Sequence, residues 1–328
     1  MIEYTPLRMH PCFKEYLWGG TRLKAEFGKL DAPEITAESW ELADHPNGQS
    51  TVADGPLAGR TLAELGKEDH DGFWGGDCTG ETFPLLVKLI DAKRDLSIQV
   101  HPSNATANVE NGEQGKLEMW YIVDCAPQSA IYFGFNRAIS REVFRRRAED
   151  GSITKVLNRV PVARGDVFYI LPGTIHAIGA GIVIAEIQQN SDTTFRVYDY
   201  QRRGAGGNLR PLHLTRAEQV LDYAPVVPSE CRANSGAVFS EFTMAEMFSC
   251  PYFRSYRLDV RTEAHLRCDG RSFQHLLCVE GAGTLQSQGG ESSFAKGNSF
   301  FLPAALGEYT ITGACRVLIS RIGKDEQP

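Results

Sequence analysis

The chain has 328 residues, a formal net charge of −7 at pH 7 and eight cysteines. This length predicts two domains, or one large β-rich domain with insertions, and 42% hydrophobic with 23% charged residues indicates a globular protein, not a disordered one. The negative charge argues against a general nucleic-acid-binding protein, although a local basic cluster could still bind a phosphorylated small molecule.

The sequence also argues against a membrane protein and against a disulfide-rich protein. The sequence has no apolar run of about eighteen residues, and its N-terminus lacks the charged and apolar regions of a signal peptide. The cysteines are scattered without a C-x-x-C pair, which argues against a disulfide scaffold and against a cysteine zinc finger. We therefore expect reduced thiols in a cytoplasmic protein that has no membrane partner.

The first part of the chain is rich in glycine and irregular. A short helix is predicted after Thr61, because T-L-A-E has the spacing of a capping box. Apolar runs and alternating patterns then predict strands, separated by an exposed loop at 103–116 and followed by a helical insert near 139–157. These predicted strands cover 83–90, 96–102, 117–124 and 131–135. The arginine cluster of the insert is interpreted as a solvated helix face, with a phosphate patch as the alternative.

Strands resume in the second half of the chain, at 165–176, 182–187 and 195–200. A further helix is predicted from Thr215, where T-R-A-E again has capping-box spacing. The pattern breaks near residue 225, so we predict one domain at 1–224 and a second at 225–328. Short strands between Gly and Pro turns in the second domain indicate an all-β sandwich or barrel.

A faint internal repeat links the two predicted domains. R-G-D-V-F-Y-I-L-P-G-T-I-H at 164–176 is similar to K-G-N-S-F-F-L-P-A-A-L-G at 296–307. Each has a basic residue, a glycine, a polar residue, an apolar strand and a proline, but the second copy has no histidine after its proline. Duplicated barrels would have this appearance if only the first kept a site.

The stretch L-S-I-Q-V-H-P at 96–102 alternates apolar and polar residues, so a strand would place Ser97, Gln99 and His101 on one face. Glu118 lies on the strand after the exposed loop, and His176 follows a P-G turn. Two imidazoles, a carboxylate and an amide oxygen suit a divalent first-row metal, with zinc as the default. The absence of a thiolate favours a catalytic site. Taken alone, Gln99 and His101 would more often be ordinary strand residues than metal ligands, and Glu118 could be an exposed strand residue.

Several stretches together resemble the type I mannose-6-phosphate isomerases, in their short bacterial form, within the cupin superfamily. They occur in the family's order up to about residue 223, whereas the C-terminal third shows only a generic barrel resemblance. The matching stretches are Y-L-W-G-G, A-E-S-W-E-L-A-D-H, L-S-I-Q-V-H-P, G-K-L-E-M-W-Y-I, L-P-G-T-I-H-A-I-G and Q-Q-N-S-D-T-T-F-R-V-Y-D-Y. The resemblance implies an all-β fold of two cupin-type jelly-roll β-barrels with a small helical insert, in which 1–224 binds the metal and 225–328 is degenerate.

The resemblance also implies roles for individual residues. The expected metal ligands are Gln99, His101, Glu118 and His176, with Zn²⁺ or another divalent first-row metal as cofactor. The expected catalytic residues are Arg196, Glu186 and Lys116, and the expected substrate-binding residues are Ser97, Lys116 and Asp192. The sequence departs from the general H-x-H cupin motif, because Gln99 replaces the first histidine and Glu118 comes seventeen positions after His101.

The implied reaction interconverts mannose 6-phosphate and fructose 6-phosphate by moving a proton between C1 and C2 through a cis-enediol. Glu186 is the candidate base, with a metal-activated hydroxide as its competitor. Arg196 would stabilise the enediolate oxygen. Besides Ser97 and Lys116, either Arg202 or Arg203 would hold the phosphate.

Plainer interpretations stay open at this point. Arg196 could pair with Asp199 or Glu186 across strands, Glu186 could face solvent, and Trp120 is expected in the core or in a pocket wall. An iron-dependent oxygenase of the cupin superfamily and a non-catalytic sugar-phosphate-binding cupin are the rival functions. The expected partner is a small-molecule sugar phosphate, and the sequence leaves the oligomeric state open.

Overall fold

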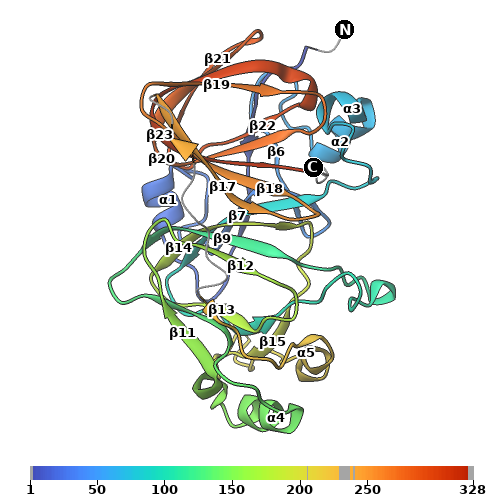
Figure 1. Cartoon of the computed structure of the whole chain (residues 1–328), viewed down its shortest axis with the longest axis vertical. Helices are drawn as coiled ribbons and strands as arrows, with labels where there is room; N and C mark the ends of the chain where they lie inside the picture. The colour runs from blue at the N-terminus through green and yellow to red at the C-terminus, as the bar shows by residue number, and fades with distance from the viewer. Residues whose placement is uncertain (1–2, 205, 229–236, 239–240, 324–328) are drawn as a thin grey trace. The chain divides into compact units, whose positions relative to one another are not determined.

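The computed structural model describes residues 3–204, 206–228, 237–238 and 241–323, and most of its regular structure is β (Figure 1). The chain divides into two units. The first unit takes 1–14, 21–89 and 233–328, and the second takes 15–20 and 90–232. The functional division of the chain near residue 225 stays a prediction. None of the helices in the described part is long and apolar enough to cross a membrane.

The first unit contains a ten-stranded antiparallel sheet built around its two longest strands, β20 and β23. The order is β16 (Ala237–Val238), β17 (Phe242–Ser249), β18 (Arg254–Val260), β23 (Gly307–Arg321), β20 (Gln274–Ser287), β22 (Ser299–Leu302), β1 (Leu7–His10) and β6 (Thr51–Val52), with β19 (Glu263–Cys268) on β23 and β21 (Gly290–Ala295) on β20. Alternate residues bury a core that includes Leu258, Leu276 and Val317.

The remaining elements of this unit are short. They are β2 (Cys12–Lys14), α1 (Arg22–Phe27), β3 (Glu38–Leu42), β4 (Asp44–His45), β5 (Gly48–Gln49), α2 (Leu62–Glu68), α3 (His70–Phe73), most of β7 (Leu85–Ala92) and η4 (Ala304–Leu306). The predicted helix after Thr61 is confirmed as α2, because Thr61 Oγ1 accepts the Glu64 N–H and Glu64 Oε2 accepts the Thr61 N–H. The predicted buried strand is confirmed as β7, all of whose residues are buried.

A histidine with no role in the predicted chemistry lies at the centre of the first unit. His275 on β20 is fully buried, and its Nε2 lies 2.8 Å from Ser299 Oγ on β22. Burial, followed by the positive charge of Lys29, lowers the pKa of His275 to about 3. The native imidazole is therefore neutral over the whole range in which an unfolded histidine, with a pKa of about 6.5, gains its proton.

This shift predicts acid sensitivity of the fold. At pH values between the native and the unfolded pKa of His275, the unfolded state binds one more proton than the native state. The free energy of unfolding is therefore highest above about pH 6.5 and falls as the pH drops. When the free energy of unfolding is measured with urea from pH 7 to pH 5, it should fall more steeply for the native chain than for an H275Q variant. At the acid end the two slopes should differ by about 1.4 kcal/mol per pH unit. Equal slopes for the two proteins would contradict the assignment.

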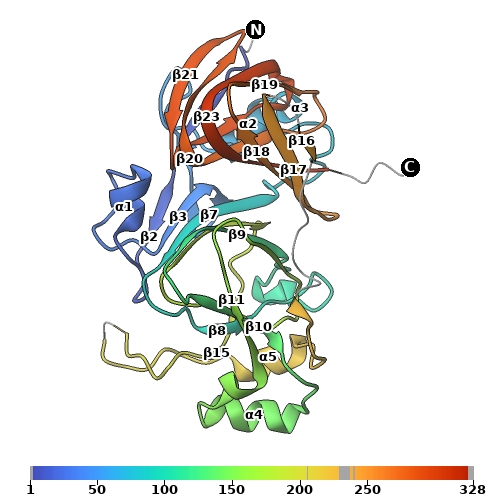
Figure 2. The same ribbon diagram turned by 60° about the vertical axis from the view of Figure 1, so that its left-hand side comes forward.

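The second unit places two groups of strands opposite one another (Figure 2). One sheet has the order β11 (Leu157–Pro161), β10 (Ala130–Phe135), β13 (His176–Ile178), β8 (Ile98–Val100) and β15 (Phe195–Tyr198). The other group is β12 (Val167–Ile170), β9 (Glu118–Cys125) and β14 (Ile182–Gln189). In the part of the chain that the structure describes, each sheet is an open path of strands.

The helical elements of the second unit are η1 (Val109–Asn111), α4 (Arg141–Glu149), η2 (Ile153–Val156) and α5 (Leu214–Val220). The predicted helical insert is confirmed as α4 and η2, with the Ser140 hydroxyl accepting the Val143 N–H at the start of α4. Both α4 and α5 pack beside β15 (Figure 1).

Three predicted boundaries in this unit are wrong. The strand expected at 165–176 is interrupted by a turn at 171–175, in which Gly173 has a φ of 87°. Strand β15 ends at Tyr198 because Tyr200 adopts a left-handed φ of 53°. Helix α5 begins at Leu214 without a capping box, because the residue before it is His213, whose Nδ1 accepts the Arg196 N–H.

The internal repeat is present in the backbone geometry of both units. Gly165 and Gly297 have φ values of 90° and 91°, and a four-residue strand starts two positions after each of them. The following residues, Asp166 and Asn298, each accept the N–H of the residue three positions back through a side-chain oxygen at 2.9 Å. Two copies of one turn, with matched hydrogen bonds, therefore begin β12 and β22.

Candidate active site

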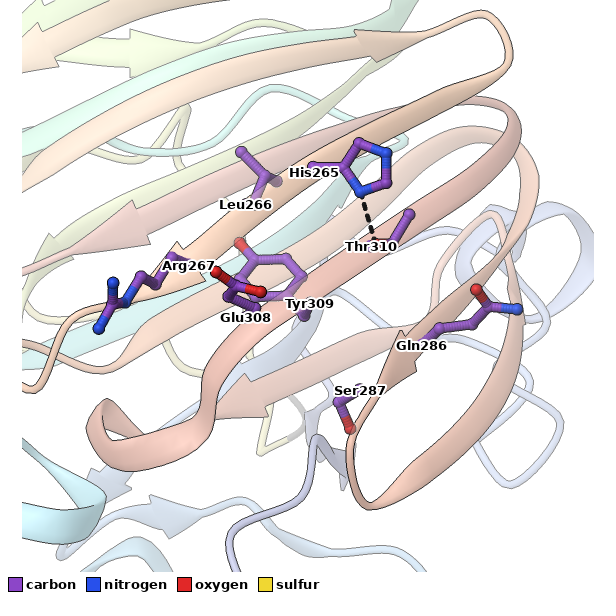
Figure 3. A pocket seen from close by; sticks show the side chains of 8 residues that line it. All are labelled: His265, Leu266, Arg267, Gln286, Ser287, Glu308, Tyr309 and Thr310. Atoms are coloured by element: carbon purple, nitrogen blue, oxygen red, sulfur yellow. Dashed lines mark hydrogen bonds between the residues drawn. The ribbon is translucent and has the colours of Figure 1, made fainter.

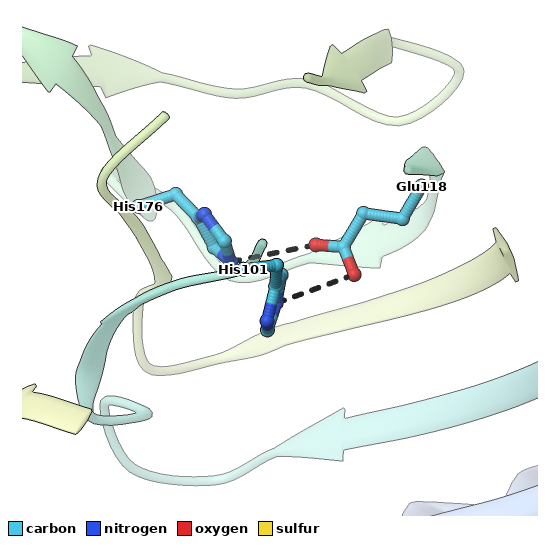
Figure 4. Close-up of side chains that lie close together, drawn as sticks. All are labelled: His101, Glu118 and His176. Carbon is cyan, nitrogen blue, oxygen red and sulfur yellow. Dashed lines mark ion pairs between the residues drawn. The ribbon is translucent and has the colours of Figure 1, made fainter. Parts of the chain in front are cut away.

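Three buried side chains from the two facing groups of strands meet in the second unit (Figure 4). His101 follows β8, His176 begins β13, and Glu118 begins β9. One nitrogen or oxygen atom from each lies within 4.8 Å of the others. The structure thus brings together three of the four predicted metal ligands.

Both imidazoles approach the carboxylate through Nε2. His101 Nε2 lies 3.5 Å from Glu118 Oε2, and His176 Nε2 lies 3.4 Å from Glu118 Oε1. The fourth predicted ligand is adjacent, because Gln99 pairs with His176 between β8 and β13 and its Nε2 lies 3.4 Å from His176 Nε2. The predicted set of four is therefore one cluster in space.

Backbone carbonyls orient the two imidazoles. His101 Nδ1 lies 2.8 Å from the carbonyl oxygen of Thr193, and His176 Nδ1 lies 2.9 Å from that of Thr174. A carbonyl only accepts hydrogen bonds, so each Nδ1 carries a proton and each Nε2 faces Glu118. Burial lowers the pKa of His176 to about 4, so this ring is neutral at pH 7 and its Nε2 presents a lone pair. Two imidazole nitrogens and a carboxylate form a donor set suited to a divalent cation.

A lysine and a second carboxylate adjoin this cluster. Lys116 Nζ lies 3.0 Å from Glu118 Oε2 and 3.8 Å from Glu186 Oε1. Glu186, on β14, is 3% exposed, and its Oε2 accepts the indole N–H of Trp120 at 2.9 Å. The alternative that Glu186 faces solvent is therefore wrong. Trp120 also packs edge-on against the His176 ring, with the ring centroids 5.4 Å apart.

Arg196 lies next to the predicted ligands, because it pairs with Gln99 between β15 and β8. Its Nη1 donates to the carbonyl oxygen of Pro211 at 2.9 Å. Burial, with the charge of Arg210 next, lowers the pKa of Arg196, yet a guanidinium keeps its charge in proteins. The carboxylate of Asp199, considered above as its partner, instead forms ion pairs with Arg202 and Arg210.

The predicted substrate-binding residues are more dispersed. Ser97 is buried directly before β8, and Asp192 is exposed in the turn between β14 and β15. Arg202 is half-buried against Asp199, whereas Arg203 is exposed and donates to the carbonyl oxygen of Gly207 at 2.7 Å. The roles of all these residues, like those of the predicted ligands and catalytic groups, stay predictions.

Some polar groups were missed by the sequence analysis. The carbonyls of Thr174 and Thr193 carry no residue-specific signal. In the first unit, Lys88 on β7 lies 3.6 Å from Glu38 Oε2, and both side chains are buried. This pair could have been predicted from the lysine inside the apolar run F-P-L-L-V-K-L-I, because a lysine is rarely buried without a partner of opposite charge.

The internal repeat identifies Gln274 as the residue of the first unit that corresponds to Glu118. Glu118 pairs with Ile170 at the end of β12, and Gln274 pairs with Leu302 at the end of β22. Gln274 donates to the carbonyl oxygen of Arg267 and accepts from Tyr309. Among the described residues, the three-residue cluster around Glu118 is the only group with metal-ligand spacing.

The first unit does contain a cavity of about 560 Å³ (Figure 3). It is lined by His265, Leu266, Arg267, Gln286, Ser287, Glu308, Tyr309 and Thr310. His265 is largely exposed, and its Nδ1 lies 2.9 Å from Thr310 Oγ1. This cavity has mixed polar walls without the convergent, buried donor set of the second unit.

Two family models match the chain. The model described as phosphomannose isomerase type I, catalytic domain, matches residues 7–120. The model described as mannose-6-phosphate isomerase, cupin domain, matches residues 243–322. The first match covers Gln99, His101 and Glu118, and the second covers the strands of the first unit from β17 to β23.

Curated relatives extend over nearly the whole chain. The mannose-6-phosphate isomerase ManA of Bacillus subtilis is 40% identical over 97% of this chain and 99% of its own length. The mannose-6-phosphate isomerase of Streptococcus mutans is 34% identical over 96% of this chain and 98% of its own length.

Solved structures agree with these matches. The mannose 6-phosphate isomerase from Bacillus subtilis superposes with a TM-score of 0.89 at 38% identity, covering 96% of this chain and 99% of that one. A zinc-bound mannose 6-phosphate isomerase has a TM-score of 0.78 at 16% identity, over 98% of this chain and all of that one, which shows a shared fold. With relatives this similar over their full length, the chain belongs to the type I phosphomannose isomerase family.

Proposed function

We propose that the chain is a metal-dependent aldose–ketose isomerase that interconverts mannose 6-phosphate and fructose 6-phosphate. The observation that carries this proposal is the buried cluster of His101, Glu118 and His176 in direct contact with Lys116, which in turn reaches Glu186. The names of the full-length relatives support the same reaction.

Gln99, His101, Glu118 and His176 would hold the metal, and Zn²⁺ is the proposed ion. The donor set fits, because both imidazoles are fixed with Nε2 toward the carboxylate and burial keeps His176 neutral. A zinc-bound structure with the same fold supports this choice. When bound, such an ion polarises the sugar carbonyl as a Lewis acid.

Glu186 is the proposed base. Its carboxylate is held by the Trp120 indole N–H at Oε2 and lies near Lys116 at Oε1. The carboxylate takes the proton from C2 of the aldose and returns it to C1, while the hydroxyl proton of O2 is transferred to O1, so that the carbonyl moves from C1 to C2. A cis-enediol is planar, so one base on one face can reach both carbons.

The cationic side chains stabilise the negative charge. Arg196 presents a planar guanidinium beside Gln99, suited to a forked contact with the enediolate oxygen. Lys116 balances the charges of Glu118 and Glu186 and contributes to binding of the phosphorylated substrate. Ser97 and either Arg202 or Arg203 are proposed for the phosphate, and Asp192 for a sugar hydroxyl.

We also propose that each unit is built on a cupin-type jelly roll. The two facing groups of strands in the second unit, the cupin-domain match at 243–322 and the duplicated turn before β12 and β22 support this reading. The C-terminal copy would be degenerate, because Gln274 stands at the position of Glu118. A cytoplasmic location and a small-molecule partner remain part of the proposal.

A coupled assay tests the proposed reaction. Fructose 6-phosphate formation from mannose 6-phosphate should be lost after chelation and return when Zn²⁺ is added to the same sample. Oxygen uptake by the metal-loaded protein, including after loading with iron, distinguishes the oxygenase alternative and is expected to be absent. A metal-loaded protein that has no isomerase activity would contradict the proposal.

A further inference from the structure

A sixteen-residue stretch of chain connects two of the predicted metal ligands. We call residues 102–117, between His101 and Glu118, the connecting segment. Apart from η1 it has no regular structure, and the Lys116 N–H donates to the carbonyl oxygen of Pro102 at 2.9 Å, which closes its base. The segment also carries the Lys116 side chain into the site. Its position therefore bears on three groups of the cluster.

The turn at 189–194 contacts the connecting segment at Gln114. Thr193 Oγ1 accepts the Gln114 N–H at 3.1 Å, and the Ser191 hydroxyl donates to the carbonyl oxygen of Gln114 at 3.1 Å. The backbone oxygen of the same Thr193 contacts His101 Nδ1 at 2.8 Å. One turn thus contacts both the segment and a predicted ligand.

An ion pair joins the connecting segment to helix α5. Arg216, on α5, binds Glu113 through both nitrogens of its fork, with Nε 2.9 Å from Glu113 Oε1. The same guanidinium donates to the carbonyl oxygen of Thr106 at 3.3 Å and stacks over Phe195 of β15, 5.2 Å from the ring centroid. Glu113 Oε2 also accepts the Asn108 N–H at 2.7 Å, which joins the pair to the segment's own backbone.

This ion pair is better placed than an ordinary surface pair. The Glu113 side chain is 13% exposed and that of Arg216 is 30% exposed, and the contact is bidentate. The hydrogen bond from Arg216 lowers the pKa of Glu113, so the carboxylate stays ionised well below neutral pH. The pair joins residues that lie 103 positions apart in the chain.

We propose that the Glu113–Arg216 pair is a positioning device that fixes the connecting segment against the 189–194 turn. Through it, His101 keeps its hydrogen bond to Thr193, and Lys116 and Glu118 keep their place beside the two imidazoles. The consequence for metal binding rests on the proposed function, whereas the consequence for the segment's order does not.

A matched control lies on the same helix. Glu218 of α5 accepts both nitrogens of the Arg145 fork at 2.6 Å, with 12% of Glu218 and 34% of Arg145 exposed. Arg145 belongs to α4 and forms ion pairs with Glu218 and Glu149, both of which lie outside the connecting segment. R145Q therefore removes the same chemistry from the same helix without touching the segment.

The experiment compares R216Q, E113Q, their double variant and R145Q in the full chain. Hydrogen–deuterium exchange of residues 102–117 and the rate of zinc release to a chelator should each rise roughly tenfold in R216Q and in E113Q, within the range that loss of an outer partner costs a metal site. Because the two residues act as one unit, the double variant should show no larger rise than either single variant. R145Q should leave both readouts within about twofold of the native chain.

Two results would overturn the proposal. One is unchanged exchange of residues 102–117 in R216Q, and the other is an equal rise in R145Q, which would indicate general loosening of α5. If the native chain neither retains zinc nor isomerises mannose 6-phosphate, the proposed function fails. The exchange of residues 102–117 would then still decide whether the ion pair positions the segment.

Discussion

Replacing Glu118 with glutamine is expected to remove metal retention and to lower isomerase turnover by more than roughly a hundredfold, the upper limit of what loss of an outer-sphere partner costs. The carboxylate lies 3.4–3.5 Å from the Nε2 atoms of His101 and His176 and 3.0 Å from Lys116 Nζ. The amide is neutral, so it would supply no charge to balance a divalent ion. Its NH₂ group would also compete for an imidazole lone pair.

Metal content after gel filtration and turnover of mannose 6-phosphate measure this effect. E149Q is the matched control, because it makes the same chemical change on α4, where the side chain is 59% exposed. The control should keep its metal and its turnover. An E118Q protein with a full complement of metal and native turnover would show that this carboxylate is not a ligand.

The second large effect is expected for E186Q, which should lower kcat by about 10²- to 10⁴-fold while metal content stays native, because a general base contributes a factor of that size. Glu186 Oε1 lies 3.8 Å from Lys116 Nζ, and its Oε2 accepts the indole N–H of Trp120. An isosteric amide keeps the packing and can still accept the indole N–H. It cannot take a proton from carbon.

The pH profile separates catalysis from structure. In the native enzyme kcat should fall on the acid side as the base becomes protonated, and in E186Q this limb should disappear. W120F keeps the carboxylate and removes the indole donor together with part of the ring that packs on His176, so it should retain the acid limb and lose much less activity. E186Q with turnover within about threefold of native would exclude Glu186 as the base.

The strand that carries Gln99 was predictable because polar and apolar residues alternate along it. The pattern of L-S-I-Q-V-H-P placed Gln99 and His101 on one face, and both reach the cluster. The start of α2 was predictable for a similar reason, since its capping box uses only residues next to one another in the chain.

Contacts between distant segments were not predictable in this way. T-R-A-E has the spacing of a capping box, yet α5 starts one residue earlier because His213 is engaged by the Arg196 N–H. Likewise, Glu113 and Arg216 read as ordinary surface charges until the fold places α5 beside the connecting segment. Geometry of the folded chain, and not local residue type, decides such contacts.

The hydrogen bonds that orient the two imidazoles place few restrictions on which amino acids can occupy the acceptor positions. Their acceptors are the backbone oxygens of residues 174 and 193, and every amino acid supplies such an oxygen. The tautomer of each ring therefore does not depend on which amino acid occupies the acceptor position. At residue 193 only the threonine hydroxyl, which accepts the Gln114 N–H, would be lost on replacement by alanine or valine. Mutations at these positions can accumulate without altering the protonation of either imidazole.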